Sequence, residues 1–147
     1  MNITVIGVGY VGLVTAVCLA ENGNKVDCID IDKEKVKKLN QGKLTIYEPG
    51  LKNLFLKNLK NKRLKIKTIL SDSVESSEII FLALPTPQKK DGSADLDHVL
   101  SVSDHIGKII NDYKIIVSKS TVPVGTSKKI IKKIEANYSG DFDVVSN

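Results

Sequence analysis

The stretch that decides the fold is Asn2-Ile3-Thr4-Val5-Ile6-Gly7-Val8-Gly9-Tyr10-Val11-Gly12. A short apolar run, typical of a buried strand, leads directly into three glycines with the spacing Gly-X-Gly-X-X-Gly. The apolar stretch from Val11 to Ala20 that follows has the length of a helix, and a second apolar segment, Val26 to Ile29, then leads to Asp30. Strand, glycine loop, helix, strand and acid come in the order that a dinucleotide-binding site requires.

Each of these positions has a physical role in that interpretation. Gly7 permits a tight turn, Gly9 lets the backbone approach a pyrophosphate, and Gly12 lets the helix pack close to the sheet. Unpaired N–H groups at the helix N-terminus would bind the anion. Asp30 would accept hydrogen bonds from an adenosine ribose and would repel the extra phosphate of NADP, so the sequence predicts NAD as the cofactor. The alternative is an ordinary strand–helix–strand unit with a glycine-rich turn.

Strand and helix patterns alternate along the whole chain. Strands are predicted at Asn2–Gly7, Lys25–Asp30, Leu64–Ile69, Glu78–Leu84, Lys114–Ser118 and Phe142–Ser146. Helices are predicted at Tyr10–Asn22, Gly50–Leu59, Leu96–Asn111 and Ser127–Ala136, and a further helix is predicted to begin after its N-cap Asp32. The N-cap of the Ser127–Ala136 helix is predicted to be Thr126 or Ser127, and a short helical turn is predicted at Asp72–Ser76. This alternation predicts an α/β protein of the Rossmann type: a doubly wound parallel sheet of about six strands in the order 3-2-1-4-5-6.

Two loops should meet the glycine loop at the carboxyl edge of this sheet, where such folds bind ligands. In Leu84-Pro85-Thr86-Pro87 the prolines remove two donors, and Thr86 would hold the ribose or phosphate region of a cofactor. Ser120 and Thr121, after the fifth strand, would face the same crevice. The alternatives are a stiff loop that only ends a strand, and hydroxyls that only cap their own turn.

The segment Tyr47-Glu48-Pro49-Gly50 precedes the third predicted helix, and its carboxylate has two interpretations. Glu48 is either a first-turn carboxylate that favours the helix dipole or a functional group. The sequence leaves both open.

Composition excludes several other classes of function. A chain of 147 residues with 41% apolar and 27% charged residues suits one folded domain. The net charge of +5 comes from basic residues spread along the chain, all lysines except Arg63, and tryptophan is absent, so nucleic-acid binding is not expected. No apolar run approaches the ~20 residues of a membrane span, and no secretory segment is present, which favours a cytoplasmic protein.

Cysteine and histidine usage does not predict a metal site. Cys18 and Cys28 fall on apolar stretches and are interpreted as reduced core residues. His98 and His105 lie seven residues apart in one predicted helix, without a third ligand, and are expected at the surface.

Four motifs, taken together and in order, resemble the UDP-glucose/GDP-mannose dehydrogenase family. They are Gly7-Val8-Gly9-Tyr10-Val11-Gly12-Leu13, Ile46-Tyr47-Glu48-Pro49-Gly50-Leu51, Asp91-Gly92-Ser93-Ala94-Asp95-Leu96 and Lys119-Ser120-Thr121-Val122-Pro123-Val124-Gly125-Thr126. The resemblance covers the whole chain and is nearest to members that oxidise the C6 alcohol of UDP-glucose to the carboxylate while reducing two NAD. Oxidation of GDP-mannose or UDP-N-acetylmannosamine is the alternative. A stand-alone regulatory nucleotide-binding module is a further one, although it gives no reason for the two proline-bearing loops.

The resemblance also implies roles for individual residues. The expected NAD contacts are Gly7, Gly9, Tyr10, Val11, Gly12, Asp30, Lys35, Thr86 and Thr121, of which Thr121 would lie near the reacting centre. The family's nucleophilic cysteine, with a lysine, an asparagine and most UDP-sugar contacts, belongs to a second domain. Residues 1–147 are therefore expected to be the NAD-binding domain, which binds NAD without catalysis, of an enzyme that is a homodimer or larger. Leu84-Pro85 replaces the Val-Gly of many members, which leaves the shape of that loop open.

Overall fold

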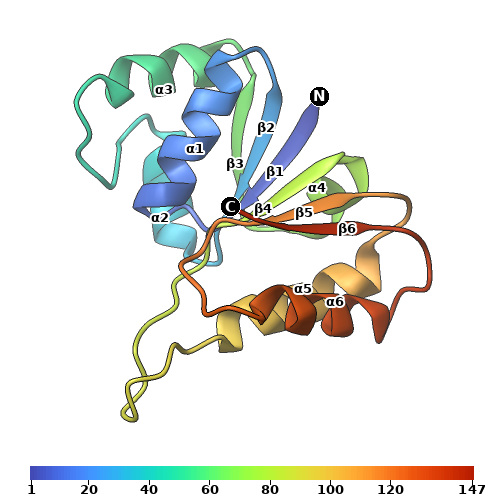
Figure 1. The fold of residues 1–147 in the computed structure, drawn as a ribbon. Coiled ribbons are helices and arrows are strands. Elements are labelled where there is room, and N and C mark those ends of the chain that lie inside the picture. The colour runs from blue at the N-terminus through green and yellow to red at the C-terminus, as the bar shows by residue number, and fades with distance from the viewer.

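A single parallel sheet organises the computed structural model, which describes residues 1–147 (Figure 1). Its strands are β1 (Asn2–Ile6), β2 (Lys25–Ile29), β3 (Leu64–Lys67), β4 (Ile79–Leu82), β5 (Ile115–Ser118) and β6 (Asp143–Ser146). They lie in the order β3-β2-β1-β4-β5-β6, and every neighbouring pair is parallel. The predicted fold class and strand order are confirmed.

Helices cover both faces of the sheet (Figure 1). On one face lie α1 (Tyr10–Glu21), α2 (Lys33–Asn40) and α3 (Leu51–Lys60), and on the other α4 (Ser71–Ser76), α5 (Asp97–Ile109) and α6 (Thr126–Glu135). The predicted strands and helices are all present, with ends that differ by at most two residues. Because each crossover runs from the end of one strand to the start of a parallel one, every loop that leaves a carboxyl end lies on the same edge.

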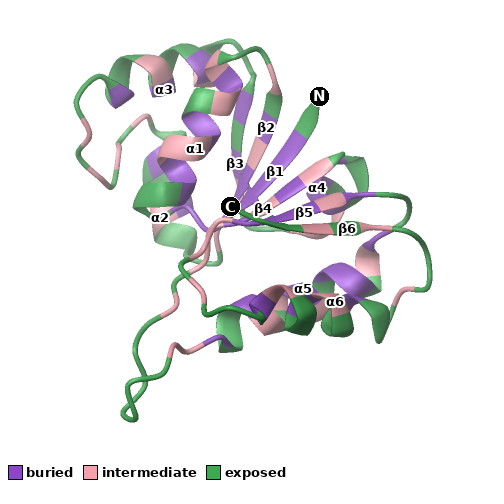
Figure 2. Ribbon diagram, viewed as in Figure 1, coloured by how far each residue is buried: buried purple, intermediate pink, exposed green.

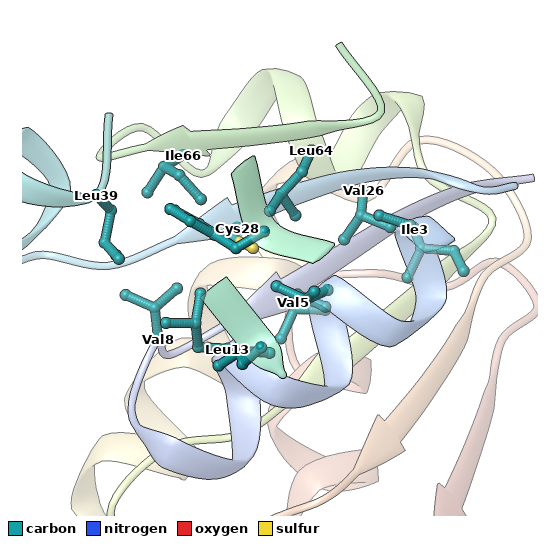
Figure 3. Packing of buried hydrophobic residues seen from close by; sticks show 14 of the residues in the cluster. Ile3, Val5, Val8, Leu13, Val26, Cys28, Leu39, Leu64 and Ile66 are labelled. Atoms are coloured by element: carbon teal, nitrogen blue, oxygen red, sulfur yellow. The ribbon is translucent and has the colours of Figure 1, made fainter. Parts of the chain in front are cut away.

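The sheet has a separate apolar core on each face. Side chains of α1, α2 and α3 pack on the first face against those of β1, β2 and β3. Figure 3 shows part of this core, with Leu13 of α1 and Leu39 of α2 among the labelled side chains. Residues of α4, α5 and α6 form the second core with β4 and β5. Strand β1 contributes Ile3 and Val5 to the first core and Ile6 to the second, so it is buried on both sides (Figure 2).

One buried polar contact belongs to the central strand. Thr4 is fully buried, and its hydroxyl lies 2.9 Å from the carbonyl oxygen of Ser73, within α4, and 2.6 Å from the hydroxyl of Ser77, which follows α4. A buried hydroxyl without such partners would destabilise the fold. This contact joins the short helix α4 to the sheet.

The predicted cap of α6 is wrong. Its N-cap is Gly125, in a left-handed backbone conformation with φ of +89°, and no side chain caps the helix. Thr126 is the first helical residue, and its hydroxyl donates to the Pro123 carbonyl at 2.7 Å. The Thr126 hydroxyl, which the sequence pattern predicted to cap α6, therefore forms its hydrogen bond within the preceding turn.

The predicted core position of Cys18 is also wrong. Cys18 is exposed on α1, whereas Cys28 in β2 is fully buried as expected. Helix α1 is apolar on nearly every side, so its sequence does not indicate which side faces the sheet. His98 and His105 are exposed on α5, as predicted.

Candidate functional site

A crevice of about 410 Å³ opens at the carboxyl edge of the sheet, beyond the ends of β1, β2, β4 and β5. Strand β1 lies between β2 and β4, so this is the point where the order of strands reverses. Eight of the nine predicted contact residues line the crevice: Gly7, Gly9, Tyr10, Val11, Asp30, Lys35, Thr86 and Thr121. Gly12 lies behind the lining. The glycine loop and the two proline-bearing loops meet there, as predicted, together with Asp30 at the end of β2.

The three glycines of the loop have different surroundings. Gly7 has φ of +95°, and a Cβ there would lie 2.4 Å from the Ala83 carbonyl oxygen. A Cβ on Gly12 would lie 1.8 Å from the carbonyl oxygen of Gly7. A Cβ on Gly9 would meet nothing within 4 Å. Gly7 and Gly12 are therefore required by packing, while Gly9 borders open space beside the crevice.

The N-terminus of α1 offers free backbone donors to this space. Its N-cap is Gly9, and no side chain caps it. The helical hydrogen bonds begin with the Leu13 N–H and the Gly9 carbonyl oxygen at 3.0 Å, which leaves the amides of Tyr10, Val11 and Gly12 without acceptors. Such a helix end attracts anions through its N–H groups and the positive end of its dipole.

Asp30 lies at the end of β2 with its carboxylate held from three sides. Oδ2 accepts from the Val8 amide at 3.1 Å and from Lys35 Nζ at 2.9 Å, and Oδ1 accepts from the Asp32 amide at 3.0 Å. Burial alone would raise the pKa of Asp30, but the hydrogen bonds from Asp32, Lys35 and Val8 outweigh it and hold that pKa below its ordinary value. Asp30 is therefore ionised at neutral pH.

The two proline-bearing loops are tied to each other across the crevice. The Thr86 hydroxyl donates to the Thr121 carbonyl at 2.8 Å. The Ser120 hydroxyl accepts from the Leu84 amide at 2.9 Å, which explains why β4 ends at Leu82, two residues before the predicted end. Ser120 therefore does not cap its own turn. The Thr121 hydroxyl, at an exposed position, has no hydrogen-bond partner in the protein.

Lys119 is a charged lining residue that the sequence analysis missed. It follows β5 directly, and its Nζ lies 2.6 Å from Asn147 Oδ1. The rule that selected Ser120 and Thr121, a position just after a parallel strand, applies equally to Lys119. Through these three residues the crevice continues into a second hollow of about 480 Å³ beside β6 and the N-terminus of α6.

A third hollow, of about 300 Å³, lies on the other side of Asp30 and has a mainly apolar lining. Its walls include Ile31, Leu84, Pro85 and Val102. Ile31 is 87% exposed, an unusual position for a large aliphatic side chain. The three hollows together follow the carboxyl edge from β2 to β6.

No three His, Cys, Asp or Glu side chains come together in a way that could hold a metal ion. Among the helices, none combines the length and the apolar character that crossing a membrane requires.

These features define the class of protein. A doubly wound parallel sheet, with free amides at the first helix beside a glycine loop and an ionised acid at the end of the second strand, is a dinucleotide-binding domain of the Rossmann type. Residues 1–147 match the model of the UDP-glucose/GDP-mannose dehydrogenase family, NAD binding domain. The chain belongs to this family of NAD-dependent oxidoreductases, and its cofactor is NAD.

Individual relatives agree with this assignment. UDP-glucose 6-dehydrogenase TuaD of Bacillus subtilis is 48% identical over 99% of this chain and 32% of its own length. The solved structure of GDP-mannose dehydrogenase from Pseudomonas aeruginosa superposes with a TM-score of 0.96 at 35% identity, over 100% of this chain and 36% of the other. A UDP-glucose dehydrogenase from Pyrobaculum islandicum gives 0.93 at 33% identity, over 99% and 35%. The chain spans about a third of the length of the relatives it matches.

Proposed function

We propose that residues 1–147 are the NAD-binding domain of an enzyme that oxidises UDP-glucose to UDP-glucuronate with reduction of two NAD. The observation that supports this most directly is the crevice, in which free amides of α1 and an ionised Asp30 lie at the switch point of the sheet. The relatives named UDP-glucose 6-dehydrogenase supply the choice of substrate. The family resemblance further supports a cytoplasmic enzyme that is a homodimer or larger, without nucleic acid or membrane as partner.

The residues present fit NAD. The open space at Gly9 and the amides of Tyr10 and Val11 suit a pyrophosphate. Asp30 Oδ1 accepts only the Asp32 amide, so it retains acceptor capacity for a ribose hydroxyl. Lys35 keeps that carboxylate oriented from the other side.

The remaining walls suit the two ends of the cofactor. The apolar hollow beside Ile31 suits an adenine ring, whereas Thr86, Thr121 and Lys119 lie toward the hollow where the nicotinamide and substrate would meet. NAD, when bound, accepts the hydride of the oxidised alcohol. The protein's own contribution here is to bind and orient the cofactor, and Thr121, with its unengaged hydroxyl, is an accessory polar group at that end.

Neither cysteine of residues 1–147 is placed to act as the nucleophile. Cys28 is fully buried in β2, and burial raises the pKa of its thiol, which keeps it protonated. Cys18 is exposed on α1 but does not line the crevice. We propose that the catalytic cysteine and most UDP-sugar contacts are supplied from outside these residues, and that residues 1–147 alone bind NAD without turnover.

Titration of residues 1–147 with NADH, followed by NADH fluorescence, tests the proposal. The wild-type chain should bind NADH and leave UDP-glucose unoxidised in the presence of NAD. Asp30→Ala should weaken binding by about 10- to 150-fold, as expected for loss of a charge-assisted hydrogen-bond partner worth about 1.5–3 kcal/mol. Glu34→Ala, an exposed acid in the first turn of α2, is the matched control and should bind like wild type. No binding by wild type, or equal binding by Asp30→Ala, would refute the site.

GDP-mannose is the second candidate substrate, because the GDP-mannose dehydrogenase structure superposes with a TM-score of 0.96. The decisive measurement is NADH production by the full-length enzyme with UDP-glucose and with GDP-mannose in parallel. A higher kcat/KM with GDP-mannose would show that GDP-mannose, not UDP-glucose, is the substrate, and the proposed NAD site would still stand.

A further inference from the structure

The segment between α2 and α3, residues 41–50, has a regular pattern of burial although it contains no helix or strand. Gly42, Leu44, Ile46 and Glu48 are half-buried, and the residues between them are exposed. Leu44 and Ile46 pack against the core on the α1 side of the sheet. Glu48 is the next half-buried position in this alternation, although its side chain is charged, unlike those of Leu44 and Ile46 before it.

The partner of this carboxylate is Tyr10. The Tyr10 hydroxyl donates to Glu48 Oε2, across 38 positions of sequence, and no lysine, arginine or histidine forms an ion pair with Glu48. Tyr10 is the first residue of α1 and lines the crevice, with 52% of its surface exposed. The contact therefore joins the 41–50 segment to the rim of the cofactor site.

Neither simpler role accounts for Glu48. It precedes the Gly50 N-cap of α3, and only its backbone carbonyl serves that turn, by accepting the Leu51 amide at 3.2 Å. It is therefore not a first-turn carboxylate of α3. Glu48 is not a direct ligand of the cofactor phosphates either, because its negative charge would repel a pyrophosphate held by the free amides of α1.

We propose that Glu48 is a positioning residue of the NAD site that acts through Tyr10. By accepting the phenolic proton it fixes a half-exposed aromatic side chain at the start of α1 before the cofactor arrives. Binding then does not have to order that side chain, which is the usual gain from preorganisation. This inference rests on the proposed function, since it concerns the site assigned there to NAD.

A double-mutant cycle on residues 1–147, with NADH and adenosine as ligands, tests the proposal. Glu48→Ala and Tyr10→Phe should each weaken NADH binding by about three- to tenfold, the size expected when one flexible side chain must be ordered on binding. In the Tyr10→Phe background, Glu48→Ala should cause no further weakening. Glu48→Gln, which keeps an acceptor oxygen, should restore most of the affinity lost in Glu48→Ala. Tyr47→Phe, on the exposed side of the same segment at 85% exposure, is the matched control and should bind like wild type.

Adenosine separates positioning from a general loss of structure, because it shares the ribose of NADH but has no phosphate to contact the amides of α1. A merely structural role would weaken adenosine and NADH binding equally. Positioning at α1 should change adenosine binding by less than about twofold, because Asp30 holds the shared ribose. Additive effects of the two substitutions, unchanged NADH binding by Glu48→Ala, or equal losses for both ligands would overturn the role of Glu48. If wild type binds NADH in any of these cases, the proposed function stands. Absence of NADH binding by wild type overturns both.

Discussion

At the residue scale, the glycine loop shows that one motif can serve folding and binding through different atoms. Gly7 and Gly12 are held against backbone oxygen atoms, and their missing side chains are a condition for packing β1, α1 and the end of β4 together. Gly9 borders open space, so its missing side chain is not required by the folded chain itself. Alanine substitutions, which add one methyl group at each glycine, can therefore separate the requirement for folding from the requirement for binding.

Gly9→Ala and Gly12→Ala should therefore fail in different ways. Gly9→Ala should keep its unfolding midpoint within a few degrees of wild type, because φ at Gly9 is −71° and a Cβ there meets nothing, but it should lose NADH affinity. Gly12→Ala should destabilise the fold by about 1–3 kcal/mol or more, as overpacking does. Thermal unfolding by circular dichroism and NADH titration of both variants decide this. A stable Gly12→Ala with normal affinity would contradict it.

Asp30 predicts a pH dependence of stability with a definite sign. Its pKa in the folded chain is lowered from the ordinary value of about 3.9. The stabilisation is therefore fully present above about pH 4 and is lost as the pH falls through the folded-state pKa. The difference in unfolding free energy between wild type and Asp30→Asn should shrink below pH 4 in urea titrations at a series of pH values. A difference that does not change with pH would show that the carboxylate contacts contribute nothing.

At the element scale, contacts between distant loops connect the strands to the helices. Lys114 precedes β5 and is 1% exposed, although it is a lysine. Its Nζ donates to the Glu75 carbonyl in α4 at 3.0 Å and contacts Asp112. A buried ammonium group therefore supplies a donor to a carbonyl in the last turn of this short helix.

Lys114→Met keeps most of the side-chain volume and removes these bonds. The variant should lose about 1–3 kcal/mol of unfolding free energy, because the Glu75 carbonyl is left without its donor. Urea unfolding against Lys128→Met, an exposed lysine of α6, provides the comparison. Equal stability of the two variants would mean that water or another group satisfies that carbonyl.

The elements themselves were predictable because local patterns determine them. Buried strands such as Ile79–Leu82 are continuous apolar runs, and Asp32 caps α2 by accepting the Lys35 amide, as its sequence position indicates. The exposed position of Cys18 was not predictable, because α1 has no polar side to mark its orientation.

The hydrogen bonds between loops, in contrast, depend on tertiary structure. The hydrogen bond from the Leu84 amide to the Ser120 hydroxyl joins residues 36 positions apart, and no local sequence rule selects that donor over a nearby turn amide. The loops that meet at the crevice could be predicted from strand order, but how their hydroxyls are used could not.

At the scale of the whole molecule, the crevice joins the two halves of the sheet. The glycine loop and Asp30 belong to the β1–β2 half, whereas Thr86 and Thr121 belong to the β4–β5 half. Strand β1 packs into both cores, so the halves should unfold together. A ligand bound across the crevice should then stabilise the entire chain.

NADH should therefore raise the temperature of a single unfolding transition. At a concentration of 100 times its dissociation constant it contributes about 2.7 kcal/mol, or roughly 5–10 °C for a domain of this size. NADPH at the same concentration should raise the unfolding temperature much less, because its additional phosphate would be repelled by the ionised carboxylate of Asp30. In Asp30→Asn the difference between the temperature shifts caused by NADH and by NADPH should be smaller. Differential scanning fluorimetry with both cofactors, checked by far-ultraviolet circular dichroism, measures this. Equal shifts for NADH and NADPH in wild type would show that Asp30 does not select the cofactor, and two separate transitions would show that the halves of the sheet are not one cooperative unit.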